Sequence, residues 1–262
     1  MKKTTLLCGA LLFCGAVFAG PFCEWDFEKT DAEGKFALSA DGKYKLRTRT
    51  LTDDGFKGKG AVLDGKTAFG LYFPAAKDWT AFTFEMKFKL SEGVDQKVGA
   101  ALICYCKHDW NRSQFLLRIT PKQQLEAQFH QTKPNPAGKF TVTSKVLNFE
   151  PGKFYTVRVA SQDGGALKIW LDGELVAVKE KDSWGFNRLT VNTIPKGNYL
   201  WLMIGNDRAN SAKIYHPFKG TVDDIRIWNE FKEPDLLAET SAGNKTASVP
   251  LIAEKKSTSA AN

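Results

Sequence analysis

The chain has 262 residues, of which 43% are hydrophobic and 25% are charged, and its formal net charge is +8 at pH 7. This composition is typical of a globular protein and excludes a fibrous or low-complexity chain. The length leaves room for one large β domain or for two small domains. The mildly basic charge fits an acidic polysaccharide, a membrane surface or an uncharged partner, so charge alone singles out no ligand.

The amino terminus has the pattern of a secretory signal. A basic start, Met1-Lys2-Lys3, precedes an apolar run from Leu6 to Phe18 that is too short to span a membrane. The residues at 17–19 predict cleavage near Ala19–Gly20, which removes residues 1–19 and leaves a net charge of +6. An uncleaved anchor is the alternative. The predicted location is secreted, periplasmic or at the cell surface, where nucleic acid is a poor candidate for a partner.

Three cysteines follow the predicted signal: Cys23, Cys104 and Cys106. Cys104 and Cys106 are two positions apart in a predicted strand, so they point to one face. In an oxidising compartment Cys23 could form a disulfide with either of them and leave one thiol free. Alternatively, all three are small buried hydrophobic residues. No second cysteine pair and no suitably spaced histidine accompanies them, so they do not indicate a zinc site.

Apolar residues recur with period two through most of the chain, which predicts antiparallel strands. The alternating segments are 82–90, 115–119, 125–130, 155–159, 167–171 and 200–204. Turn residues such as Asp172-Gly173 separate them. Residues 98–106 are apolar on both faces and predict a central strand. Many strands without helical crossovers predict an all-β fold, an antiparallel two-sheet jelly-roll sandwich, over residues 20–231.

The composition changes after Phe231. A short helix is predicted from Pro234 to Glu239, and residues 240–262 are rich in Ser, Thr, Ala and Lys, which predicts a disordered tail. No hydrophobic anchor follows, so no membrane span is predicted.

The last predicted strand, Phe218 to Asn229, contains a break in its alternation. Ile225 and Ile227 share one face, but strict alternation would place Val222 on the other. A strand that buries all three must shift phase between Asp223 and Asp224, which predicts a β-bulge. Such a bulge turns two adjacent carboxylates toward different environments.

Several segments, in order, resemble a laminin G-like domain of the concanavalin A-like lectin/glucanase superfamily. They are Trp25-x-Phe27-Glu28, Gly58-x-Gly60-Ala61-Val62-Leu63-Asp64-Gly65, Phe82-Thr83-Phe84-Glu85-x-x-Phe88-Lys89, Leu167-Lys168-Ile169-Trp170-Leu171-Asp172-Gly173 and Phe218 to Asn229. The resemblance implies the jelly-roll fold over residues 22–231. It does not fix a function, since this fold carries lectins, adhesion modules, hydrolases and lyases.

The resemblance also implies a structural Ca²⁺ where the first and last strands meet. Its ligands here would be Glu28 or Asp26 with Asp223, together with backbone carbonyls near Asp41-Gly42. Oxygen ligands of this kind suit Ca²⁺. The alternative is that Asp223 and Asp224 cap the bulge and pair with Arg226 or a lysine.

The spacing of Glu24, Asp26 and Glu28 resembles the catalytic strand of laminarinase-like retaining glycosidases. Period two would place all three carboxylates on one face. Glu24 and Glu28, however, are about 13 Å apart at Cα on a flat strand, whereas retaining chemistry needs carboxyl groups only about 5 Å apart. We therefore expect this strand to pair with the closing strand, with Trp25 and Phe27 inward.

The candidate ligand-binding residues lie in and beside the loop that follows residue 106, and on one later strand. Aromatic rings stack on sugar faces, and planar polar groups bind vicinal hydroxyls or a carboxylate. These candidates are Tyr105, His108, Trp110, Arg112, Gln114 and Trp170. Residues 184–188 are a further candidate loop. The alternatives are that the loop residues are solvated and that a neighbouring loop covers Trp170.

The sequence favours an exported, non-catalytic binding module that recognises a glycan or a cell-surface ligand. It contains no zinc-protease, nucleophile-elbow, phosphate-loop or dinucleotide motif. A glycoside hydrolase or polysaccharide lyase of the same fold is one alternative. A protein-interaction or adhesion domain without a sugar site is another. The sequence does not indicate an oligomeric state.

Overall fold

The computed structural model describes residues 20–48, 50–73, 79–92, 99–107, 113–130, 139–162, 165–180, 200–207 and 214–234. The predicted signal, the tail and all but the first residue of the predicted short helix lie outside these ranges. Among the described residues, no helix is long and apolar enough to cross a membrane.

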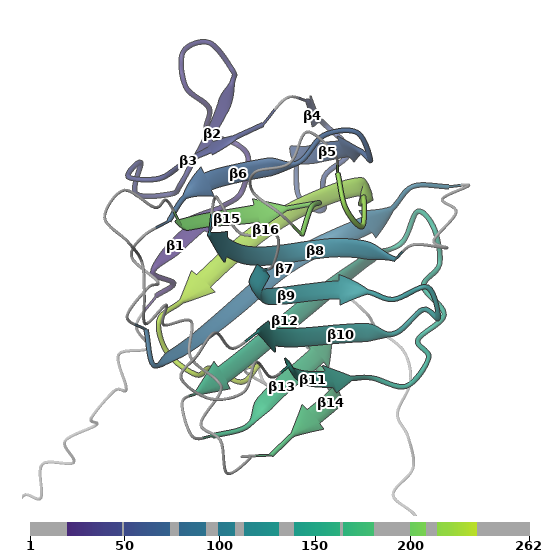
Figure 1. Cartoon of the computed structure of the whole chain (residues 1–262). Coiled ribbons are helices and arrows are strands. Elements are labelled where there is room, and N and C mark those ends of the chain that lie inside the picture. Colours follow the sequence, from purple (N-terminus) through teal and green to yellow (C-terminus); the bar gives the residue numbers. More distant parts are fainter. Residues whose placement is uncertain are drawn as a thin grey trace, which may run out of the picture.

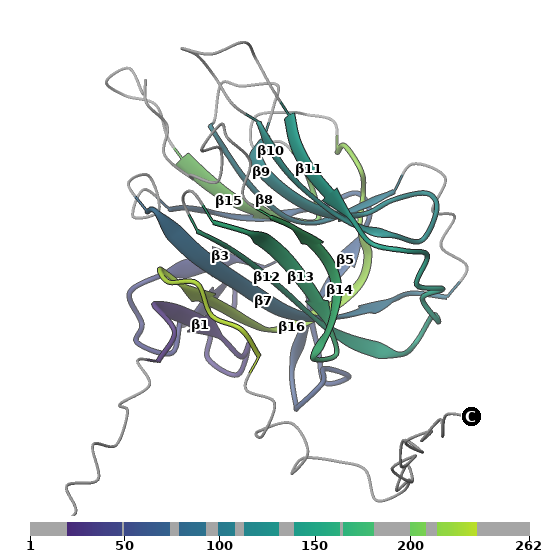
Figure 2. The same ribbon diagram turned by 90° about the horizontal axis from the view of Figure 1, so that it is seen from below.

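Two antiparallel sheets face each other, as Figures 1 and 2 show. The predicted sandwich is therefore confirmed. The eight-stranded sheet has the order β14-β13-β12-β7-β16-β5-β4, and β1 pairs with β16 beside this path. Its strands are β1 (Cys23–Trp25), β4 (Leu51–Thr52), β5 (Gly60–Asp64), β7 (Ala81–Leu90), β12 (Phe154–Gln162), β13 (Leu167–Leu171), β14 (Glu174–Lys179) and β16 (Lys219–Trp228).

The six-stranded sheet has the order β11-β10-β9-β8-β15-β6. Its strands are β6 (Phe69–Tyr72), β8 (Ala100–Lys107), β9 (Ser113–Ile119), β10 (Leu125–His130), β11 (Lys139–Thr143) and β15 (Leu200–Ile204). The strand predicted to be central is β8, which pairs with β9 and β15. A separate hairpin joins β2 (Phe36–Leu38) to β3 (Lys45–Arg47).

The main core lies between the two sheets. Phe84, Met86 and Phe88 alternate along β7 and are fully buried, and Phe115 and Leu117 meet them from β9. The rings of Phe84 and Phe115 are 5.4 Å apart. Each such side chain contributes about 1.5–3 kcal/mol by leaving water. Because these alternate side chains are the ones that leave water, the apolar positions of period two in the sequence mark the inner face of the sheet.

The closing strand β16 contains the predicted bulge. Asp223 pairs with Lys87, and Arg226 pairs with Glu85. Between these two pairs β16 contains one residue more than β7. The bulge includes Asp224, whose backbone has a φ of 45°. Val222, Ile225 and Ile227 are consequently all buried.

Strand β1 pairs antiparallel with β16, with Trp25 opposite Ile225. Trp25 and Phe27 are fully buried, as predicted, although Phe27 lies beyond the end of β1 and has a φ of 60°. The amino-terminal strand therefore joins the closing strand in the eight-stranded sheet, and Glu24, the carboxylate within β1, pairs with Arg226.

Candidate functional site

The predicted loop cluster is only partly within the described residues. His108, Trp110 and Arg112 lie outside them, as do residues 184–188 and the side chain of Gln114. Tyr105 is described and is fully buried, and its hydroxyl donates a hydrogen bond to the carbonyl of Phe73 at 3.0 Å. Tyr105 points into the core because Cys104 and Cys106, on either side of it, point outward. The predicted placement of Tyr105 on a ligand-binding surface is therefore corrected. The roles of His108, Trp110, Arg112 and Gln114 stay predictions.

Trp170 lies on the outer face of the eight-stranded sheet but is only 5% exposed. The chain after β16 returns across it, and the ring of Phe231 lies 6.3 Å from the Trp170 ring. This is the covered arrangement that the sequence left open as an alternative. Lys168 and Glu233 form an ion pair of 2.6 Å between the strand and this returning segment.

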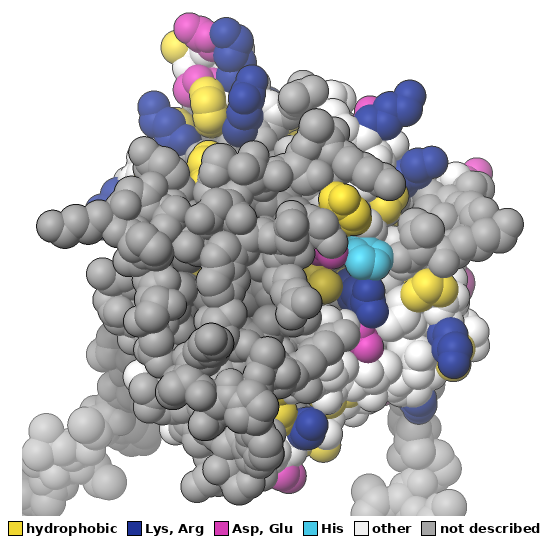
Figure 3. Space-filling view, viewed as in Figure 1, with side chains coloured by type: hydrophobic (Ala, Val, Ile, Leu, Met, Phe, Trp, Pro, Cys, Tyr) yellow, Lys and Arg dark blue, Asp and Glu magenta, His cyan; other side chains and the backbone are white. Residues whose placement is uncertain are grey.

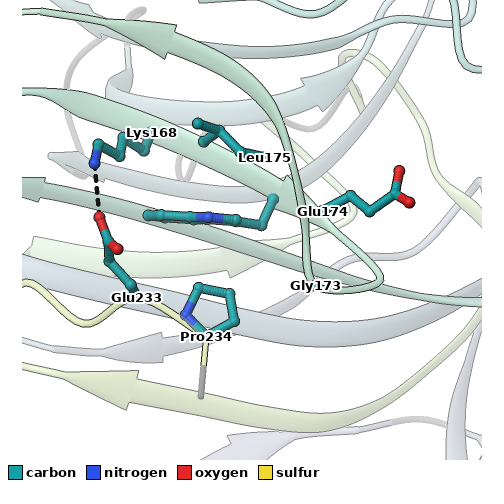
Figure 4. Close-up of a pocket in the computed structure, with 7 residues that line it drawn as sticks. Lys168, Gly173, Glu174, Leu175, Glu233 and Pro234 are labelled. Carbon is teal, nitrogen blue, oxygen red and sulfur yellow. Dashed lines mark hydrogen bonds and ion pairs between the residues drawn. The ribbon is translucent and has the colours of Figure 1, made fainter. Parts of the chain in front are cut away.

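A pocket of about 570 Å³ remains beside Trp170. Figure 4 shows the ion pair of Lys168 with Glu233 on one side of it and Glu174 at the other end. Pro234 and Leu175, which is 50% exposed, supply apolar walls. The volume is in the range of small-molecule sites, but Trp170 offers little free ring surface for stacking.

A connected polar network lies on the outer face of the six-stranded sheet. Arg118 on β9 and Glu126 on β10 are direct cross-strand partners, and the Arg118 Nη2–Glu126 Oε1 distance is 2.7 Å. Arg118 Nε also donates to Glu126 Oε1 at 2.8 Å. Gln128 donates to the same carboxylate. Figure 3 looks onto this face and shows histidine, basic and acidic side chains gathered in one place.

His216 extends the network from the segment before β16. Its Nε2 is 3.0 Å from Arg118 Nη1, and its Nδ1 is 2.8 Å from Asp207 Oδ2. A guanidinium only donates hydrogen bonds, so Nε2 must accept and the proton of a neutral imidazole lies on Nδ1, facing Asp207. The backbone of His216 has a φ of 49° and its carbonyl accepts from Ala101 N at 2.8 Å. A positive φ at a non-glycine residue that the fold holds in place is a recurrent feature of functional sites.

The polar network, defined here as Asp207, His216, Arg118, Glu126 and Gln128, is partly open to solvent at His216 and Arg118, whereas Gln128 and Asp207 are buried. The side chains of His216 and Arg118 are 28% and 20% exposed. Alternation explains the outward direction of Arg118, since Leu117 and Ile119 on either side are buried in the core. The polar network contains N–H donors in Arg118 and Gln128 and carboxyl oxygen acceptors in Asp207 and Glu126. It can therefore offer both donors and acceptors to a ligand.

A small apolar cluster adjoins the polar network on the same face. It consists of Ala101, Cys104, Cys106, Leu116 and Met203, all buried, with Ala68 and Trp201 packed against it. Cys23 belongs to the main core instead. The three thiols are free, and the disulfide between Cys23 and Cys104 or Cys106 that the sequence left open is absent because these residues lie in different clusters.

The two predicted calcium ligands, Glu28 and Asp223, hold one loop, residues 55–59. Asp223 Oδ2 accepts hydrogen bonds from Phe56 N at 2.8 Å and Lys57 N at 3.2 Å. Glu28 Oε1 accepts from Lys59 N at 2.6 Å. Gly58, with a φ of 71°, lets the loop approach, because a Cβ there would collide with the Glu28 carboxylate.

Calcium does not fit these contacts well. The backbone N–H groups already supply the positive partial charge that an ion would bring, and the described residues contain no group of three or more His, Cys, Asp or Glu side chains able to hold a metal. Burial raises the pKa of Asp223 to about 6, although hydrogen bonds from the backbone N–H groups of Lys57, Asp224 and Phe56 act to lower it. The resemblance predicts calcium binding by Glu28 and Asp223, whereas their contacts with backbone N–H groups argue against it. A titration decides between the two.

We expect that adding millimolar Ca²⁺ to EDTA-treated protein leaves the melting temperature unchanged. An ion that binds only the native state would raise it by mass action, and Asp223→Ala would remove that rise. A rise in the wild type that is lost in Asp223→Ala would establish the calcium site. Elemental analysis of the purified protein controls for an ion that EDTA does not remove.

The carboxylates of the glycosidase-like spacing have separate structural partners. Glu24 pairs with Arg226 at 2.7 Å, and Asp26 Oδ1 accepts from the backbone N of Glu28 at 3.1 Å. Glu28 holds the loop at Lys59. These partners give each carboxylate a role in the fold and do not arrange them as a nucleophile with a general acid.

Sequence reasoning missed the polar network. Arg118, Glu126 and Gln128 were visible only as the polar positions of two strands. Their meeting depends on the register of β9 with β10. Asp207 and His216 come from segments that follow β15 and precede β16, and no spacing in the sequence links them to Arg118.

Comparison with known proteins supports the fold. A laminin G family model, described as the concanavalin A-like lectin/glucanases superfamily, matches residues 64–236. The carbohydrate-binding module CBM40 of the Ruminococcus gnavus IT-sialidase, bound to α2,3 sialyllactose, superposes with a TM-score of 0.55 at 17% identity. That match covers 70% of this chain and 96% of that one. A search of curated proteins found no match.

Two larger enzymes share the architecture over part of their length. Trypanosoma rangeli sialidase matches with a TM-score of 0.53 at 13% identity, over 82% of this chain and 31% of that one. The leech intramolecular trans-sialidase matches with a TM-score of 0.52 at 18% identity, over 74% of this chain and 28% of that one. This chain thus spans about a third of each enzyme. The structural likenesses establish the fold alone, and the family model shows that this chain belongs to the concanavalin A-like lectin/glucanases superfamily.

Proposed function

We propose that this protein is an exported glycan-binding module and that the polar network on the six-stranded sheet contacts the sugar. The observation that carries this proposal is the continuous arrangement of Asp207, His216, Arg118, Glu126 and Gln128 on one partly exposed face. The basic start and short apolar run of residues 1–18 support export.

The chemistry of the polar network suits sugar hydroxyls. Each hydroxyl both donates and accepts, and planar side chains held in place lose little entropy when they bind. Arg118 is held by Glu126 on one side and His216 on the other. The site is therefore organised before a ligand arrives.

The choice of first ligand follows from the charge of the site and from the comparisons. A carbohydrate-binding module of the same fold binds sialyllactose, which carries a carboxylate. In the polar network, Glu126 already neutralises Arg118, which favours hydroxyl contacts over a carboxylate. Sialyllactose and lactose are therefore the first pair of probes, because they separate binding of the acid from binding of a neutral sugar.

The pocket beside Trp170 is the competing surface on the opposite sheet. It has an apolar wall in Leu175 and a charged side in Lys168 and Glu233. Leu175→Asp changes this pocket at an exposed position and leaves the polar network intact.

We expect Arg118→Gln to weaken glycan binding roughly tenfold to a hundredfold, the effect of losing hydrogen bonds from a charged group. A glycan array that includes both probes identifies the ligand, and calorimetry gives the affinity. Arg47→Gln, at an exposed position on β3, makes the same chemical change away from the site and should leave affinity unchanged.

The outcomes separate the two surfaces. If Leu175→Asp loses affinity for the glycan and Arg118→Gln keeps it, the glycan binds in the pocket beside Trp170 and not at the polar network. Absence of binding to any glycan on the array would contradict the proposed function and favour a protein-interaction domain.

A further inference from the structure

Cys104 and Cys106 form a close pair of thiols on the outer face of β8. Their Sγ atoms are 3.6 Å apart, and the Cys104 thiol donates a hydrogen bond to the Cys106 sulfur. Both side chains are fully buried in the small apolar cluster next to the polar network. No part of the proposed glycan contact uses them.

Local geometry brings the two sulfurs together. Residues two apart on a strand point to one face, and the register of β8 with β9 shifts between Tyr105 and Cys106. Such an irregularity bends the strand. Cys23 lies in the other cluster, so Cys104 and Cys106 have only each other as neighbouring thiols among the described cysteines.

We infer that Cys104 and Cys106 are a modification site that closes to an intramolecular disulfide when the folded protein meets a small disulfide oxidant. The inference is independent of the proposed glycan contact. It requires the two sulfurs to move from 3.6 Å to the bonding distance of about 2.05 Å.

The hydrogen bond sets the order of the reaction. The Cys104 thiol is held as the donor of the hydrogen bond to Cys106, and burial together with this bond raises its pKa. Cys106 is therefore the first nucleophile and reacts as the thiolate. The Cys106 thiolate attacks oxidised glutathione, an S–S bond forms, and one glutathione thiolate leaves. The Cys104 thiolate then attacks the Cys106 sulfur of this mixed disulfide and expels the second glutathione. The two cysteine protons end on two glutathione molecules, which have taken up two electrons.

Burial makes the reaction slow. Burial also raises the pKa of the Cys104 thiol, so little thiolate is present in the closed structure. The oxidant therefore reaches the two thiols only when the structure opens locally. The pair sits in a small satellite cluster and not in the main core, so local opening can expose it without unfolding the whole sandwich.

Peptide mapping of the full chain tests the inference. Folded protein is incubated with oxidised glutathione, quenched with acid and separated from glutathione. It is then unfolded in denaturant, alkylated with iodoacetamide at mildly alkaline pH, where free thiols are reactive, and digested with trypsin. Residues 98–107 form one tryptic peptide that holds both cysteines. We expect this peptide to resist alkylation and to be lighter by two hydrogen atoms, while Cys23 is alkylated.

Two single variants test the order of attack. Cys104→Ser should accumulate a mixed disulfide of Cys106 with glutathione, because the second nucleophile is missing. Cys106→Ser should stay largely reduced. If both cysteines of the wild-type peptide are alkylated, or if the mixed disulfide persists in the wild type, the inference is wrong. The same incubation in denaturant is the control. Both thiols are exposed there, so the first attack on oxidised glutathione should be faster than in the folded protein, in which both are buried.

Discussion

Replacing Glu85 by alanine should lower the free energy of unfolding by about 3–5 kcal/mol, the cost of leaving a buried charge without its partner. Glu85 lies on β7 between two arginines on neighbouring strands. Its Oε2 is 2.6 Å from Arg158 Nε, and its Oε1 is 3.4 Å from Arg226 Nη1. Glu85 and Arg158 are only 4% and 8% exposed, so water cannot replace the lost carboxylate at Arg158.

The neighbouring Glu24 gives a matched control for this prediction. It pairs with Arg226 at 2.7 Å, but the two side chains are 28% and 34% exposed. Glu24→Ala should therefore cost no more than about 1 kcal/mol. Urea unfolding followed by intrinsic fluorescence measures both variants.

A double variant separates the unpaired charge from lost packing. In Glu85→Met with Arg158→Leu no buried charge is left alone at this position, so much of the stability lost in Glu85→Ala should return. A loss in Glu85→Ala as small as that in Glu24→Ala would show that Arg158 finds water or another partner, and would contradict this account.

The sandwich could be predicted from the sequence because its two decisive signals are local. Period two marks the inner face of β7 and β9, and the phase shift at Asp223 and Asp224 marks the bulge. Both follow from which side chains must leave water. The pairing of β1 with β16 followed from the resemblance and from the tendency of chain ends to meet.

The candidate site was harder to predict because it depends on register and on returning segments. Residues 98–106 are apolar on both faces, so the sequence could not decide whether Tyr105 or its neighbours Cys104 and Cys106 point inward. The cover over Trp170 comes from Phe231, 61 positions later in the chain. The contact between Arg118 and His216 joins residues 98 positions apart. The periodicity of a sequence does not indicate contacts between residues so far apart in the chain.

Asp223 should make the protein less stable as the pH rises from about 4 to about 6. Burial raises the pKa of this carboxyl from its usual 3.8 to about 6 in the folded protein. The native state therefore holds its proton more tightly than the unfolded chain does. The contribution is greatest below pH 4 and is lost as the pH passes 6, and a shift of this size corresponds to about 3 kcal/mol.

Urea unfolding between pH 4 and pH 7 measures this contribution. Asp223→Asn cannot titrate, so the fall in stability over this window should be smaller in the variant than in the wild type by up to about 3 kcal/mol. Asp54→Asn is the control, because Asp54 pairs with Lys89 but its side chain is 79% exposed, and its pH profile should follow that of the wild type.

The sign of the difference decides between two physical effects at Asp223. Its carboxylate is fully buried, which favours the protonated form. It also accepts hydrogen bonds from the backbone N–H groups of Phe56, Lys57 and Asp224, which favour the ionised form. A wild type that loses more stability than Asp223→Asn as the pH rises shows that burial prevails. A wild type that instead gains stability relative to the variant would show that the three N–H donors prevail. In that case the loop at residues 55–59 would be held by a full negative charge throughout this range.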